Sequence, residues 1–304
     1  MTEPYRILAL DGGGLRGIFT TAVLVEAEET YGPAFLDSFN LLVGTSTGGI
    51  IALGLASGRS CREMLEFYRQ AGPEIFNKPR WLRRLVGPKY DRAPLDLLLR
   101  KQFGETIRMN DLAKPVCITA HELVSGTTRV WKDDHSSELR WGGEQLVWKV
   151  AASTSAAPTY FAPVQLGDVD SHVDGSVWGS NPAMVGITEA VRYAGRELCD
   201  IRLLSIGTTS QPLRIGSHAQ VAKIGLLHWM LKTLNLLQGS SSMAADNQTR
   251  LLLGTDSYLR LDSDRARSIK FDDVEQCRPL QEWGHDVGRK NISAIGLLLG
   301  LNRR

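Results

Sequence analysis

The chain has 304 residues, enough for one large α/β domain or two small ones with a substantial core. Hydrophobic residues make up 43% and charged residues 22%, which is the composition of a globular protein and excludes extensive disorder. The 35 basic and 33 acidic residues leave a net charge of +2, so charge gives no indication of nucleic-acid binding.

The cysteines and the chain ends indicate the compartment. The four cysteines are far apart and include no Cys-x-x-Cys pair: Cys61, Cys117, Cys199 and Cys277. This spacing predicts neither a zinc site nor a disulfide framework, and it favours a reducing compartment. No signal segment precedes the first predicted strand, and no apolar stretch reaches the length of about 18 residues that spans a bilayer. We therefore expect a cytoplasmic protein without a metal or cofactor.

Short apolar runs alternate with helical patterns over the first two thirds of the chain. The predicted strands are 5–10, 40–43, 116–121, 129–132, 171–173 and 201–206. The predicted helices are 18–31, 50–56, 61–71, 144–155 and 182–194. Such alternation predicts a mostly parallel sheet between two layers of helices, a three-layer α/β/α sandwich. With no internal repeat or linker, we expect one domain over 1–304. Its core covers about 5–210, and a helical C-terminal part of about 211–304 packs on or caps it.

Two segments depart from this alternation. Residues 78–89 carry five basic side chains and Trp81 but no acidic residue. They suit either a contact with anionic headgroups or a solvated loop. Residues 221–237 have an apolar stripe that ends at Ser240-Ser241-Ser242, which we expect to break the helix. This amphipathic segment suits a lid, a membrane-contacting helix or a helix that faces the core.

A serine between glycines follows the second predicted strand. The run Gly44-Thr45-Ser46-Thr47-Gly48-Gly49 has the pattern Gly-x-Ser-x-Gly at a strand-to-helix junction. The glycines permit a tight turn that exposes the serine hydroxyl, as a nucleophile requires. An ordinary βα turn or a phosphate-binding loop has the same pattern. A Walker A loop is excluded, because Ile50 stands where that loop needs a lysine.

A second glycine turn, Asp11 to Gly17, follows the first predicted strand. It matches the dinucleotide fingerprint Gly-x-Gly-x-x-Gly. A dinucleotide-binding Rossmann fold, however, needs an acidic residue at the end of its second strand. The Ser46 turn occupies this place instead, so a non-enzymatic nucleotide-binding module is the weaker alternative. In the enzyme interpretation, the amides of Gly12, Gly13 and Gly14 face an oxyanion. Arg16 then braces the loop or pairs with an anionic substrate, unless it is only a surface charge.

The serine needs a base, and two kinds of residue are candidates. The six histidines lie outside any recognisable motif: His121, His135, His172, His218, His228 and His285. One of them could complete a Ser-His-Asp triad in an esterase. Asp174 ends a short strand and precedes Gly175, which makes it the better candidate, although Asp-Gly is also a common turn signal.

The order of these motifs resembles the patatin-like phospholipase family. The resemblance rests on 11–17, 44–49 and Asp174-Gly175, with further similarity at 151–163 and Asn181-Pro182. It extends from about Arg6 to Thr208, and Ser176 departs from the glycine or alanine usual in the family. The family implies that Ser46 is the nucleophile and Asp174 the base. It also implies an oxyanion hole from Gly12, Gly13 and Gly14 with support from Arg16, and no histidine in the dyad.

The resemblance also implies a substrate and partners. The substrate is a fatty-acyl ester of a membrane glycerophospholipid, reached by peripheral contact with the inner membrane. The segments 56–60, 72–76 and 88–91 further resemble bacterial patatin-like effectors of antiphage systems. That subfamily implies activation by a cyclic di- or oligonucleotide, for which the basic and aromatic residues of 78–89 are suited. No nucleic-acid partner is expected, and a homo-oligomer is compatible with the sequence.

Overall fold

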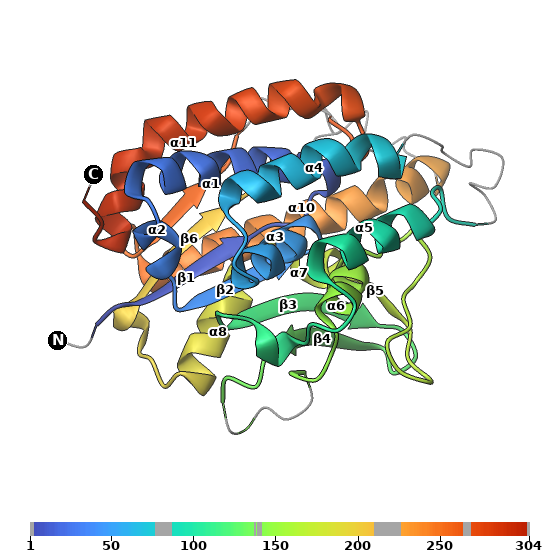
Figure 1. Cartoon of the computed structure of the whole chain (residues 1–304), viewed down its shortest axis with the longest axis horizontal. Coiled ribbons are helices and arrows are strands. Elements are labelled where there is room, and N and C mark those ends of the chain that lie inside the picture. The colour runs from blue at the N-terminus through green and yellow to red at the C-terminus, as the bar shows by residue number, and fades with distance from the viewer. Residues whose placement is uncertain are drawn as a thin grey trace.

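A mostly parallel sheet forms the centre of the computed structural model, which describes residues 3–76, 87–136, 138, 142–209, 226–263 and 269–302 (Figure 1). Its strands are β1 (Tyr5–Leu10), β2 (Leu41–Thr45), β3 (Val116–Glu122), β4 (Thr127–Lys132), β5 (His172–Asp174), β6 (Ile201–Ile206) and β7 (Tyr258–Leu261). Within the described residues the order is β4-β3-β2-β1-β6-β7, and β5 pairs with β3. Only β4 and β5 run antiparallel to their neighbour β3. The predicted mostly parallel sheet is confirmed.

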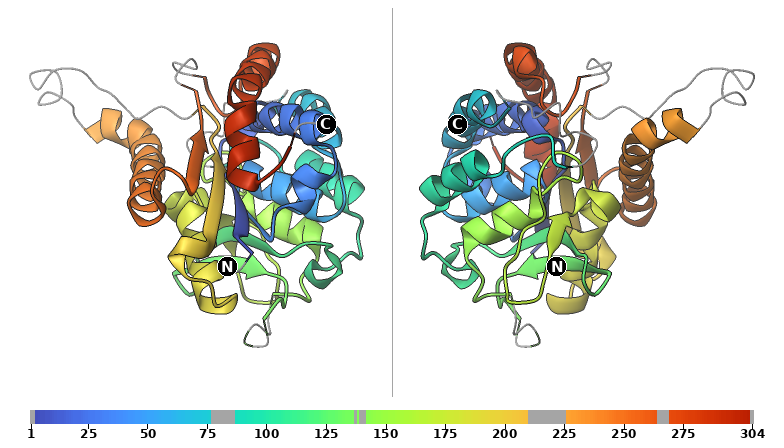
Figure 2. Two further views of the ribbon diagram at one scale, coloured as in Figure 1. Left: turned by 90° about the vertical axis from the view of Figure 1, so that its left-hand side faces the viewer. Right: turned by 90° about the vertical axis from the view of Figure 1, so that its right-hand side faces the viewer.

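Helices cover both faces of this sheet (Figure 2). They are α1 (Gly17–Tyr31), α2 (Ala34–Asp37), α3 (Thr47–Ala56), α4 (Cys61–Phe76), α5 (Ala93–Phe103), α6 (Val147–Thr154), α7 (Ser176–Gly179), α8 (Ala183–Tyr193), α10 (Leu226–Leu253) and α11 (Cys277–Leu299). Short 3-10 turns are η1 (Gly14–Arg16), η3 (Met109–Asp111), η4 (Leu198–Asp200) and η5 (Val274–Gln276). Helices α1, α3, α4 and α11 lie on one side of the sheet, and α8 and α10 lie on the other. The three-layer prediction is therefore confirmed.

The two faces of β1 enter separate parts of the core. Leu8 and Leu10 pack with the side chains of α1, α3 and α11, whereas Ile7 and Ala9 pack with those of α8. Successive side chains of a strand point to opposite faces, and both faces of β1 are covered by helices. This double burial explains why residues 7–10 of β1 form a continuous apolar run rather than an alternating pattern.

Three expectations for helices and strands were wrong. Helix α10 continues through Ser240-Ser241-Ser242, where we expected it to end. Two of these hydroxyls have partners outside the helix: Ser241 donates to the Trp178 carbonyl at 2.7 Å and Ser242 to Asp11 at 3.2 Å. Helix α4 runs beyond residue 71 to Phe76, with Pro73 inside it. The C-terminal part is not purely helical, because β7 extends the sheet beside β6.

The structure describes only part of the basic segment 78–89 and of the amphipathic segment 221–237. Residues 78–86 of the basic segment and 221–225 of the amphipathic one lie outside the described residues. Lys89 is described, and its ammonium pairs with Asp272 instead of standing free for a headgroup. Across the described chain, no helix is both long enough and apolar enough to cross a bilayer.

Glycines allow the start of α3 to approach the end of β1. A Cβ on Gly48 would lie 2.1 Å from the Leu10 carbonyl oxygen, and one on Gly44 would lie 2.4 Å from the Gly48 carbonyl oxygen. Both distances are far inside van der Waals contact, and the opposing atoms are backbone atoms that cannot rotate away. The turn before α3 therefore depends on glycine at both positions.

We predict that Gly48→Ala lowers the free energy of unfolding by about 3 kcal/mol, because the added methyl group overpacks a fixed backbone contact. Urea unfolding followed by circular dichroism measures the change. Gly179→Ala is the matched control, since its Cβ would meet nothing closer than 3.9 Å. Equal stability of the two variants would show that the turn does not require the close approach.

Candidate active site

Ser46 lies in a strained turn between β2 and α3. Its φ is +54° and its ψ is −120°, a conformation that non-glycine residues rarely adopt. The residue occupies the N-cap position of α3, yet its hydroxyl makes no capping hydrogen bond. Its amide donates to the Thr154 hydroxyl at 2.8 Å, which holds the turn from the side of α6. The hydroxyl is thus left to face the cavity that Ser46 lines.

The register of β3 brings Asp174 to Ser46. Strand β2 pairs with the first half of β3 and ends with Thr45 beside Thr119. Strand β5 pairs with the second half, with Asp174 beside Ala120. The last residue of β2 and Asp174 therefore lie beside consecutive residues of β3, one strand step of about 3.3 Å apart along it. Ser46 follows Thr45 directly, so the two predicted residues meet although they are far apart in the sequence.

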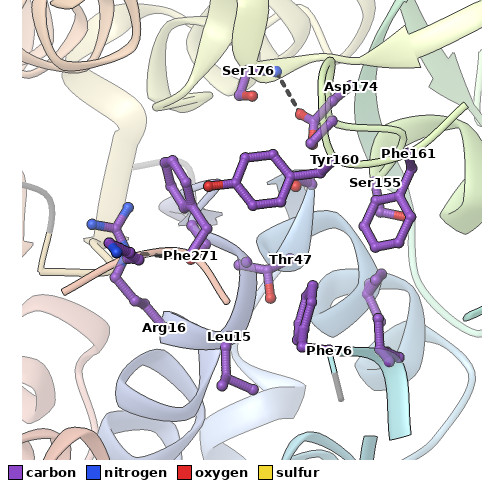
Figure 3. A pocket seen from close by; sticks show the side chains of 18 of the residues that line it. Leu15, Arg16, Thr47, Phe76, Ser155, Tyr160, Phe161, Asp174, Ser176 and Phe271 are labelled. Carbon is purple, nitrogen blue, oxygen red and sulfur yellow. Dashed lines mark hydrogen bonds between the residues drawn. The ribbon is translucent and has the colours of Figure 1, made fainter. Parts of the chain in front are cut away.

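Asp174 is buried and chemically perturbed. Only 1% of its surface is exposed, and burial raises the pKa of its carboxyl from 3.8 to about 6. A hydrogen bond from the Ser46 hydroxyl acts in the opposite direction and lowers this pKa, as does the Ser176 amide, which donates to Oδ1 at 2.8 Å (Figure 3). A carboxylate with a pKa near 6 is a much stronger base than an ordinary one, and it is still ionised at pH 7.

The glycine loop lies against the serine. A Cβ on Gly12 would come 3.4 Å from the Ser46 Cβ, so the loop and the serine turn are in contact. The Gly12 amide already donates to the Ser180 carbonyl at 2.9 Å. Gly13 and Gly14 follow and also line the cavity. Of the three predicted amides, those of Gly13 and Gly14 are therefore the better placed to receive an oxyanion.

Arg16 is a buried part of this loop, with 7% of its surface exposed. Its Nε donates to the Gly13 carbonyl at 3.2 Å, and its guanidinium lies 4.5 Å from the centroid of the Phe271 ring. These contacts fit the predicted bracing of the loop. They exclude the alternative that Arg16 is only a surface charge.

A cavity of about 860 Å³ contains all of the predicted site residues. Its apolar and aromatic lining includes Leu15, Ile50, Phe67, Ile75, Phe76, Leu95, Tyr160, Phe161, Leu234, Ile269 and Phe271. Aromatic rings from Phe76, Tyr160, Phe161 and Phe271 stand around the space beside Asp174 (Figure 3). The volume is within the range of pockets that bind small molecules, and the lining suits a hydrocarbon chain.

The histidines lie elsewhere. Those whose side chains the structure describes are His121, His135, His172 and His285, and none of them lines the cavity. His135 hydrogen-bonds Asp133 and Glu189, at 3.0 and 2.9 Å. His218 and the side chain of His228 fall outside the described residues. Within the described part of the chain, no histidine is placed to serve Ser46.

Residues 8–187 match the patatin-like phospholipase family, which is more than half of the chain. The chain belongs to this family. Its enzyme class is therefore that of a lipid acyl hydrolase, as the motifs predicted.

Similar proteins agree with this assignment. A cGAMP-activated phospholipase of Vibrio cholerae is 35% identical, over 73% of this chain and 69% of that protein. A cGAMP-activated phospholipase of Escherichia coli is 34% identical, over 96% of this chain and 87% of that protein. The crystal structure of VipD from Legionella pneumophila matches with a TM-score of 0.52, covering 96% of this chain and 67% of that one at 12% identity. This last similarity concerns the fold.

Several contacts of this patatin-like site were not found from the sequence. Thr154 lies in the recognised segment 151–163, but nothing there singled out its hydroxyl as the acceptor for the Ser46 amide. Gln238 on α10 donates to the Ser176 hydroxyl at 2.8 Å, and the amide of Ser176 is a donor to Asp174. The Phe271 carbonyl accepts from the Leu15 amide at 2.8 Å, at the edge of the glycine loop. Gln238 and Phe271 come from the C-terminal third of the chain, where no local pattern marks them.

The pKa of Asp174 predicts the pH dependence. A base must be deprotonated to act, so kcat/KM for a soluble short-chain ester is expected to rise through a midpoint near pH 6 and level off above pH 7. At pH 5 the value is expected to be about one tenth of the plateau.

A mixed solvent provides the control. Ionisation of a carboxylic acid creates charge, so added ethanol raises its midpoint, whereas ionisation of an imidazolium creates none and is not shifted upward. Thermal melting at each pH checks that the protein stays folded. A midpoint that fails to move upward in ethanol would contradict Asp174 as the titrating base.

Proposed function

We propose that this chain is a serine acyl hydrolase that cleaves fatty-acyl esters of membrane glycerophospholipids with Ser46 and Asp174. The observation that carries the proposal is that Ser46, a strained serine whose hydroxyl makes no capping hydrogen bond to α3, lies beside a buried carboxylate of raised pKa. Both line one apolar cavity, next to a loop of glycine amides. This combination is what acyl transfer requires: a nucleophile, a base and donors for the oxyanion.

In the acylation step the Ser46 hydroxyl attacks the ester carbonyl carbon, and its proton passes to Asp174. The carbonyl oxygen becomes an oxyanion that the amides of Gly13 and Gly14 stabilise, with Arg16 holding the loop. Loss of one such donor typically costs about 3 kcal/mol of transition-state stabilisation. The intermediate collapses by breaking the ester C–O bond, and Asp174 returns the proton to the departing lysophospholipid alcohol.

Deacylation repeats these roles with water. Asp174 removes a proton from a water molecule, whose oxygen attacks the acyl carbon on Ser46. The bond to the serine oxygen breaks, the fatty acid leaves, and Ser46 regains its proton from Asp174. The apolar lining of the cavity supports a long acyl chain during both steps. For such a substrate we propose peripheral contact with the inner membrane, made from the cytoplasm.

We predict that Ser46→Ala and Asp174→Asn each reduce the hydrolysis of phospholipid vesicles at least about 10³-fold, because each removes a member of a unit that acts together. Release of fatty acid measures the rate. Ser57→Ala, at the other end of α3, and Asp168→Asn, on an exposed loop, are matched controls expected to keep full activity.

Alanine variants of the six histidines test the alternative esterase mechanism. Each folded variant is expected to keep activity within a few-fold of the parent. Full activity of Asp174→Asn, together with loss of activity in a folded histidine variant, would replace the dyad with a Ser-His-Asp triad.

Activation by a cyclic nucleotide, in the setting of antiphage defence, is the second part of the proposal. It rests on the two cGAMP-activated phospholipases to which the chain is similar, which match 73% and 96% of its length. An enzyme that degrades the membrane of its own cell needs to stay inactive until a signal arrives. A small diffusible nucleotide is a suitable signal. If it binds the active conformation of the protein more tightly than the inactive one, it shifts the population towards the active conformation.

A panel of cyclic di- and oligonucleotides tests this part. One member is expected to raise vesicle hydrolysis by at least about tenfold, as a coupling of 1.4 kcal/mol or more would produce. The linear form of the same nucleotide is the control and is expected to have no effect. High activity without any nucleotide, unchanged by every member of the panel, would remove the activator from the proposal.

A further inference from the structure

A buried charged cluster lies behind the glycine loop, and no step of the proposed mechanism uses it. Arg260 on β7 donates to both carboxylate oxygens of Asp11, from Nη1 to Oδ1 at 2.8 Å and from Nη2 to Oδ2 at 2.6 Å. Their side chains are 11% and 2% exposed. A two-point contact between a guanidinium and a carboxylate fixes orientation as well as distance.

The sheet aligns these two residues. Ala9, Ser205 and Arg260 are paired across β1, β6 and β7. The Arg260 side chain also donates to the Ser205 hydroxyl at 2.7 Å, so it passes over the face of β6 on its way to Asp11. Asp11 is two residues beyond Ala9 and directly precedes Gly12. The carboxylate is therefore anchored where the strand ends and the glycine loop begins.

The same guanidinium organises the neighbouring loop after β6. Its Nη2 donates to Asp262 at 2.8 Å, and the other oxygen of Asp262 accepts from the Thr209 amide at 2.8 Å. Thr208, one residue earlier, donates its hydroxyl to the Gly12 carbonyl at 2.8 Å. A Cβ on Gly13 would lie 2.2 Å from this same hydroxyl, so the loops are in tight contact. Gly12 is thus fixed on both sides, by Asp11 before it and by Thr208 beside it.

We infer that Arg260 is a positioning residue, which holds the amides of Gly13 and Gly14 in register with the oxyanion through Asp11 and the loop of Asp262. This inference rests on the proposed function, in which these amides stabilise the oxyanion. A lysine cannot replace Arg260, because its single ammonium is a point charge without the planar fork that spans two carboxylates. The C-terminal third, beyond the family match at 8–187, thereby determines the geometry of the N-terminal glycine loop.

Arg260→Lys tests the inference, and Arg289→Lys is the matched control, because Arg289 is 61% exposed and pairs with Glu26 at the surface. Kinetics are measured on p-nitrophenyl butyrate, together with inhibition by a trifluoromethyl ketone, which forms an oxyanion on the serine. In Arg260→Lys, kcat is expected to fall about 10²-fold, as for a small displacement of catalytic groups, with KM within about twofold. The inhibition constant of the ketone is expected to rise by a similar factor, because it depends on the same amides.

Near-UV circular dichroism and thermal melting show whether the variants are folded. Asp11→Asn is the second variant, which keeps the side-chain shape but removes the charge, and it is expected to change kcat and ketone inhibition in the same direction. A folded variant of either kind with unchanged kcat and ketone inhibition would overturn the inference. The inference would also be overturned if the activity of each variant fell only in proportion to the fraction of protein that is folded. Ser46→Ala in the same assay separates the two ideas, because activity in that variant would contradict the proposed function itself.

Discussion

The register of β3 is the constraint on which the site depends. The first half of β3 pairs with β2 and its second half with β5, so the carboxyl ends of β2 and β5 lie next to each other beside β3. Thr45 and Thr119 fix this junction by a hydroxyl–hydroxyl hydrogen bond of 2.7 Å. A slip of one residue in β5 would turn the Asp174 side chain to the opposite face of the sheet. The proposed role of Ser46 therefore depends on strand pairing as much as on the serine turn itself.

Features encoded by short stretches of sequence could be predicted. Strands 5–10 and 201–206 match β1 and β6, because short, mostly apolar runs followed closely by glycine have few other uses in an α/β protein. The turn at Ser46 and the glycine loop were also found, because backbone contacts require glycine at Gly44 and Gly48 in the turn and at Gly14 in the loop. Helix α10 through Ser240–Ser242 could not be predicted, because contacts with distant residues outweigh the weak helix propensity of serine.

The residues that surround the site had no local signal for a related reason. Gln238, Arg260 and Phe271 belong to three separate segments, and each acts on a partner more than 60 residues away in the chain. Single-sequence patterns report the periodicity of an element, but they do not report which strand lies beside which. The order β1-β6-β7 is what carries Arg260 to Asp11. The burial of Asp174 likewise depends on distant segments, because α6 and β3 contact β5, and α10 packs on α7, which directly follows β5 in the chain.

Covalent labelling with a fluorophosphonate probe shows whether a carboxylate alone activates Ser46, as we propose. Peptide mass mapping identifies the modified residue, and the rate of labelling reports how reactive the serine is. We expect one adduct, on Ser46, whose formation slows about 10²-fold in Asp174→Asn and is unaffected by replacing any histidine. An adduct on another residue would show that Ser46 is not the nucleophile, and labelling of Asp174→Asn at the parent rate would show that Asp174 does not activate it.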